Sequence, residues 1–95
     1  MQGLGVTQDY SEGARYYRMA AEQGHRSAQA ALGAMYFMGK GVPQDYVQAH
    51  LWSNLASVDG DEQLLKLRNE IEKRMTPTQV AEAQKLAREW KPKKE

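Results

Sequence analysis

A stretch of this chain repeats itself at an offset of 36 residues. Residues 3–10 then align with residues 39–46, and six of the eight pairs are identical. Residues 3–24 as a whole give eight identities in 22 pairs, and the exchanges keep small residues opposite small ones and aromatic residues opposite aromatic ones, as with Tyr16 and Trp52. A period of this length is typical of proteins built from stacked helix pairs.

Helix start signals fall at matching places in the two copies. Each copy contains a capping box, in which an acceptor residue is followed three residues later by Glu or Gln: Asp9 with Glu12, and Asp45 with Gln48. The two side chains of such a box accept hydrogen bonds from backbone N–H groups that have no partner at a helix start. Between them, Ser27 is placed to cap a further helix. Each copy therefore contains a helix that begins at an Asp.

Helix stop signals are glycines. Gly24 and Gly60 follow the two matching helices, and Gly39 follows the helix between them. The residue just past a helix end often takes a left-handed conformation, which glycine adopts freely. The Gly-x-Gly segments at 3–5 and 39–41 are interpreted as tight turns and not as phosphate-binding loops, because neither has the further glycine such loops need.

These signals predict an all-α chain of five helices in antiparallel hairpins. The apolar residues are mainly Ala, Leu, Met and aromatic types, with one Phe and one Ile, which suits packed helices better than a sheet. The last helix opens at another capping box, Thr76-Pro77-Thr78-Gln79. The expected helices lie at 9–23, 27–38, 45–58, 61–75 and from 77 to about 90.

One copy of the unit resembles the Sel-one-like repeat, a relative of the tetratricopeptide repeats. The positions that carry the resemblance are Ala28, Leu32, Gly33, Tyr36, Gly39, Gly41, Asp45, Ala49, Trp52, Ala56 and Gly60. The other copy is only the back half of a unit, with Gly13 where the family usually has Ala. Residues 61–95 depart from the pattern and resemble the polar terminal cap that a solenoid needs.

The resemblance implies a fold and a role. The fold is a right-handed α-α superhelix, as a single helical-repeat domain over residues 1–95. Its expected parts are a partial repeat at 3–24, a full repeat at 25–60, a capping helix pair at 61–90 and a basic tail at 91–95. The role is that of an adaptor or scaffold that binds a helix or peptide of a partner protein.

Gly33 lies in the middle of an expected helix, where it costs about 1 kcal/mol relative to Ala. Close approach of a neighbouring helix would compensate for that cost. We expect an aromatic ring to fill the space, from Tyr16, Tyr17 or Trp52.

No pattern in the sequence indicates catalysis, a metal or a cofactor. His25 and His50 are too far apart to form a metal-binding pair on one helix turn, and there is no cysteine. No serine lies in the Gly-x-Ser-x-Gly context of a nucleophile. We therefore predict that the chain is not an enzyme and has no catalytic residue, metal or cofactor.

Partner contacts are expected at positions that the repeat pattern leaves free. Gln29, Phe37 and Tyr17 are the candidates, since aromatic anchors concentrate binding energy. The first helix lacks the other helix of its own unit, so its apolar face should be exposed or covered by another copy. This predicts self-association or domain swapping through that helix.

The charge is nearly balanced, with 13 basic and 12 acidic residues. Lys91, Lys93 and Lys94 form the one run of like charge, and we expect them to lie in an untethered, solvated end. Binding of nucleic acid by this basic end is the alternative function. The sequence shows no membrane span and no signal peptide, and the compartment stays open between the cytoplasm and, if an upstream signal has been removed, the periplasm.

Overall fold

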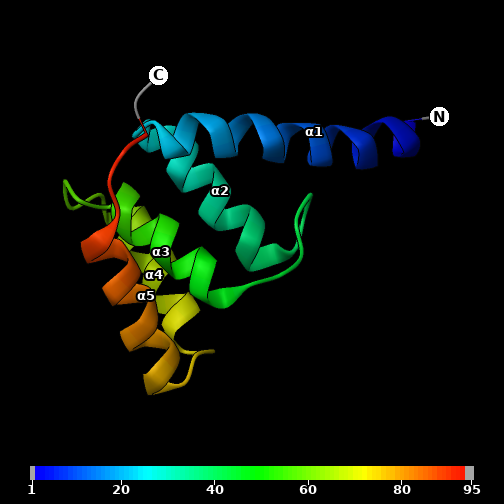
Figure 1. Ribbon diagram of the computed structural model, residues 1–95. Helices are drawn as coiled ribbons and strands as arrows, with labels where there is room; N and C mark the ends of the chain where they lie inside the picture. The colour runs from blue at the N-terminus through cyan, green and yellow to red at the C-terminus, as the bar shows by residue number, and fades with distance from the viewer. Residues whose placement is uncertain (1, 94–95) are drawn as a thin grey trace.

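The part of the chain described by the computed structural model, residues 2–93, folds into five α-helices and contains no strand (Figure 1). Side chains are described for residues 10–93. The all-α prediction is confirmed. The helices are α1 (Gln2–Glu22), α2 (Arg26–Met38), α3 (Tyr46–Ala56), α4 (Glu62–Glu72) and α5 (Pro77–Glu89).

The α2–α3 hairpin is the centre of the molecule. α1 packs mainly on α2, while α4 and α5 both pack on α3, so α3 is enclosed by three helices. In Figure 1, α1 crosses the top of the molecule, and α3, α4 and α5 lie close together below it. The core contains Ala21, Ala28, Leu32, Tyr36, Ala49, Leu51, Trp52 and Ile71.

Two of the predicted helix starts are confirmed, one of them only in half. At α5 the capping box is complete, since Thr76 and Gln79 each accept the other's backbone N–H. At α3, the carboxylate of Asp45 accepts the backbone N–H of Gln48 at 3.1 Å. The Gln48 side chain does not complete this second box, because its Oε1 accepts the indole N–H of Trp52 at 3.2 Å.

The turn between α2 and α3 is confirmed as well. Gly39 and Gly41 have φ angles of 71° and 78°, in the left-handed region that favours glycine. The Gly39 N–H donates to the carbonyl of Met35, which closes the end of α2. Gly41 also lies against the backbone of Tyr10, where a Cβ atom would overlap the carbonyl oxygen. The turn therefore lets the α2–α3 loop approach α1.

Two predictions about helix starts are wrong. α1 begins at Gln2, so the expected turn at residues 3–5 is helical and Asp9 lies inside the helix; the side chain of Asp9 is outside the described residues. Among the described residues no helix comes before α1, and helical hydrogen bonds satisfy the backbone at residues 3–5. α2 begins at Arg26, with His25 as its N-cap residue, so Ser27 is already inside the helix.

The prediction for Gly33 is right about the close approach and wrong about the neighbour. A Cβ atom on Gly33 would lie 2.6 Å from Oγ of Ser53, 3.1 Å from its backbone nitrogen and 3.2 Å from the carbonyl oxygen of Ala49. The small residues of α3 thus bring its backbone against α2. The Ser53 side chain and the backbone of α3 fill the space in place of an aromatic ring.

Candidate functional site

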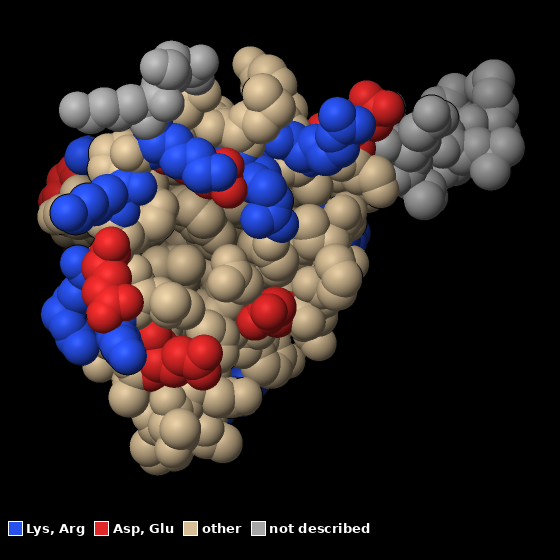
Figure 2. Space-filling model, viewed as in Figure 1, with Lys and Arg blue, Asp and Glu red and all other residues tan. Residues whose placement is uncertain are grey.

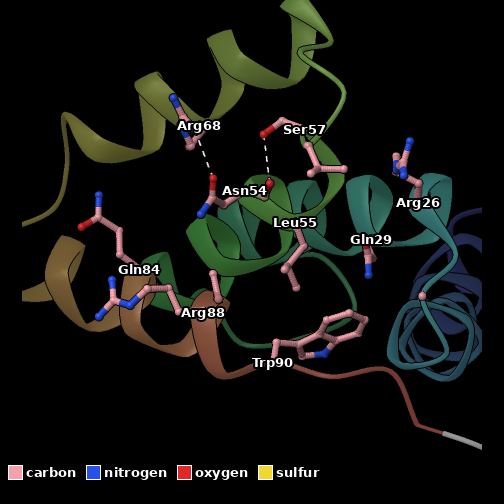
Figure 3. Close-up of a pocket in the computed structure, with 12 residues that line it drawn as sticks. Arg26, Gln29, Asn54, Leu55, Ser57, Arg68, Gln84, Arg88 and Trp90 are labelled. Atoms are coloured by element: carbon pink, nitrogen blue, oxygen red, sulfur yellow. Dashed lines mark hydrogen bonds between the residues drawn. The ribbon is translucent and has the colours of Figure 1, made fainter.

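An open cavity of about 720 Å³ lies near the ends of several helices. It lies between the start of α2, the end of α3, the middle of α4 and the end of α5 (Figure 3). A cavity of this size falls within the usual range of ligand pockets. The lining residues are Gly24, Arg26, Gln29, Asn54, Leu55, Ser57, Val58, Arg68, Gln84, Ala87, Arg88 and Trp90.

The three arginines of the cavity differ in their partners. Arg26 forms an exposed ion pair with Asp59. Arg68 donates from one terminal nitrogen to Oδ1 of Asn54 at 3.1 Å, while its Nε is buried without a hydrogen-bond partner among the described residues. Arg88 forms no hydrogen bond or ion pair with any described residue. The sequence does not reveal this group, because its members lie on three helices and no short motif joins them.

The wall beside the arginines is held in place by Trp90. Its ring packs edge-on against Trp52 of α3, with the ring centres 6.2 Å apart. Trp90 ends α5, and its backbone N–H donates to the carbonyl of Ala87. The chain then crosses to the end of α1, where the Lys93 N–H donates to the Glu22 carbonyl at 2.7 Å.

The prediction of an untethered basic end is therefore wrong for Lys93. Besides its backbone bond, its ammonium group lies 3.2 Å from a carboxylate oxygen of Glu22. The carbonyls at the end of a helix have no partner within the helix, and an incoming N–H satisfies one of them. Lys94 lies outside the described residues. On the face shown in Figure 2, basic side chains lie along the upper edge and at the left, with acidic side chains among them.

A buried histidine links α3 to α4. His50 is 1% exposed, and its Nε2 lies 2.6 Å from Oε2 of Glu72. Nδ1 of His50 has no hydrogen-bond partner among the described residues. The same carboxylate lies 4.0 Å from Nε of Arg68, which connects this pair to the edge of the cavity.

The three predicted partner-binding residues do not form one surface. Gln29 is only 3% exposed, and its amide donates to the carbonyl of Ala21, so it offers little to a partner outside the cavity. Phe37 packs partly buried between Tyr46 and the guanidinium group of Arg74. Tyr17 is 37% exposed on α1. A partner contact through Phe37 or Tyr17 stays a prediction.

The aromatic residues of the two copies have different surroundings. Tyr36 and Trp52 are buried as the repeat pattern predicts, but Tyr16, the counterpart of Trp52, is 71% exposed. The exposure of Tyr16 agrees with the expectation that the first helix, without the other helix of its own unit, has an uncovered face. α3 has neighbours on three sides, whereas α1 rests mainly on α2, so nothing among residues 10–93 covers this ring.

No metal site is visible in the described part of the chain, since no three His, Asp or Glu side chains come together there. None of the helices, as far as they are described, combines the length and the apolar character needed to cross a bilayer.

The repeat pattern, the hairpins and the glycine contacts agree with one known family. The Sel1 repeat profile matches residues 1–25 and 26–61, which is more than half of the chain. The chain belongs to the Sel1 repeat family. Among curated proteins, none matches this sequence significantly.

A solved structure supports the assignment to the Sel1 repeat family. It is the crystal structure of a protective antigen present in uropathogenic Escherichia coli strains, and it displays an SLR fold. The two are 40% identical with a TM-score of 0.80, over 94% of this chain and 19% of the antigen. This chain thus spans about a fifth of the length of the antigen.

Proposed function

We propose that this Sel1 repeat chain is a protein-interaction module that binds a helix or an extended peptide of a partner protein. The observation that carries the proposal is the fold, since Sel1 repeats generally mediate contacts between proteins. The open cavity at the helix ends and the exposed aromatic side chains of α1 offer such a partner two surfaces.

We infer further that the chain is not an enzyme. The pair most similar to catalytic machinery is His50 with Glu72, but His50 is enclosed by α3 and α4 and is 1% exposed. A general acid or base must come within hydrogen-bond reach of its substrate. A histidine in this position connects two helices, which is a structural role.

The alternative, nucleic-acid binding through the basic C-terminal end, has less support. Lys73 and Arg74 both lie beside Glu70, and Lys93 lies beside Glu22. Binding to phosphates depends on basic side chains gathered along one face. Carboxylates interrupt such a face here.

The experiment that tests the proposed function is affinity capture from native lysate by the immobilised chain, with quantitative mass spectrometry of the retained proteins. The matched variants are Tyr17→Ala and Phe37→Ala, which remove candidate contacts. Trp52→Ala, which removes a core ring, serves as the control for loss of the fold. We expect a dominant protein that the wild-type chain retains and Trp52→Ala does not. Equal retention by both would contradict the proposal.

We also propose that the exposed face of α1 mediates contacts between copies of the chain. Tyr16 and Met19 are 71% and 61% exposed there, and apolar patches of this kind often mark contact surfaces. Light scattering over a range of concentrations should give a mass that rises above that of a monomer, and Tyr16→Glu should abolish the rise. A monomeric mass at high concentration would exclude this contact.

A further inference from the structure

The cavity at the helix ends has an uneven charge. None of its twelve lining residues is acidic, while three are arginines: Arg26, Arg68 and Arg88. Because the whole chain carries nearly equal numbers of acidic and basic residues, this local excess does not reflect the composition. A cavity lined by one sign of charge attracts ligands of the opposite sign.

Two of the arginines have unused hydrogen-bond donors. Arg26 is occupied by Asp59 at the rim, but Arg88 has no described partner, and the one hydrogen bond of Arg68 goes to the neutral amide of Asn54. The carboxylate closest to Arg68, that of Glu72, lies 4.0 Å from Nε and is already bonded to His50. Figure 3 shows Arg68 on α4 and Arg88 on α5, on opposite sides of Asn54. Free guanidinium donors bind carboxylates in a bidentate manner.

The rest of the lining suits a peptide better than a free ion. Leu55, Val58, Ala87 and the ring of Trp90 give the cavity an apolar part. Asn54, Ser57 and Gln84 add uncharged polar groups able to bond a peptide backbone. Pockets that combine an apolar wall with a few polar groups bind one ligand in a fixed orientation.

We propose that this cavity binds a short acidic segment of a partner protein. Carboxylates of the segment lie against Arg68 and against Arg88, and a neighbouring apolar side chain lies on Leu55 and Trp90. This inference rests on the proposed function and specifies the chemistry of the partner. A nucleic acid fits less well, since its many phosphates need a basic track, and Arg26 at the rim of this cavity is already paired with Asp59.

The test uses fluorescence anisotropy with three labelled probes: a short peptide of alternating Glu and Leu, the same peptide with Lys in place of Glu, and a short oligothymidylate. Arg88→Gln and Arg68→Gln remove one charge each from the cavity. Lys85→Gln is the matched control, because it removes one charge from the same helix as Arg88 and does not line the cavity. Circular dichroism confirms that each variant folds.

We expect the acidic peptide to bind the wild-type chain and the Lys85→Gln variant alike, and to lose about tenfold in affinity for Arg88→Gln. Arg68→Gln should show a similar loss, and the Lys peptide should not bind. Equal losses for Arg88→Gln and Lys85→Gln, or tighter binding of the oligothymidylate, would overturn the inference. If a captured protein partner binds Arg88→Gln unchanged, the interaction function stands and this cavity is not its site.

Discussion

Adding one methyl group at Gly33 is a test of how closely α2 and α3 pack. Gly33→Ala gains about 1 kcal/mol of helix propensity, but its Cβ would meet backbone atoms of α3, and overpacking a core costs about 1–3 kcal/mol. We expect a net loss of stability of about 1 kcal/mol in urea unfolding. Gly13→Ala is the control, because the added Cβ would meet nothing within 4 Å. This variant should raise the free energy of unfolding by about 0.5–1 kcal/mol. A Gly33→Ala variant as stable as Gly13→Ala would contradict this packing.

Glu72 and Glu70 lie on the same helix, and their carboxylates contact a buried side chain and exposed side chains, respectively. Glu72→Ala leaves buried His50 with neither ring nitrogen paired, at a cost of about 1–3 kcal/mol. Glu70→Ala removes only exposed contacts to Lys73 and Arg74, worth less than about 1 kcal/mol. Chemical unfolding of both variants measures the difference. Similar losses would mean that the His50 contact adds little.

At the scale of the helix, the start of α5 depends on its capping box. Thr76→Ala removes the Oγ1 that accepts the Gln79 N–H at 3.1 Å, at a cost of about 1 kcal/mol. In a domain of this size that lowers the Tm by about 4–8 °C. Thr78→Ala changes the same residue type two residues later, where the side chain is exposed and forms no hydrogen bond with any described residue, and should leave the Tm nearly unchanged. Thermal unfolding followed by circular dichroism distinguishes the two.

The helices could be predicted from the sequence where the signal was local. Thr76 and Asp45 determine helix starts through bonds within a few residues, and Gly39 sets a helix end through its own backbone conformation. The start of α1 was missed, because whether a Gly-x-Gly segment turns or stays helical depends on what packs beside it. The neighbour of Gly33 was missed for a similar reason, since small residues across a hairpin approach as closely as an aromatic ring would.

At the scale of the whole molecule, the candidate site was beyond prediction from the sequence. Arg26, Arg68 and Arg88 belong to helices whose relative placement depends on long-range packing, and each alone resembles any other exposed basic residue. The same holds for Lys93, whose contact with Glu22 joins the C-terminal segment to the last turn of α1. Repeat periodicity predicts neighbours along the stack, but not contacts between its first and last elements.

The arrangement of helices predicts a gradient of local stability. α3 packs against three helices, whereas α1 is held mainly by α2 and by the C-terminal segment at its last turn. Native-state hydrogen exchange should therefore be about tenfold slower or more in α3 than in α1, because local opening is easiest where fewest contacts are broken. Deleting residues 91–95 should speed exchange in the last turn of α1, where Glu22 loses its Lys93 partner, and leave α4 unchanged as the internal control. Uniform exchange rates across α1 and α3 of the wild-type chain would mean that the molecule opens only as a whole. An unchanged exchange rate in the last turn of α1 after the deletion would mean that the C-terminal segment does not hold α1 in solution.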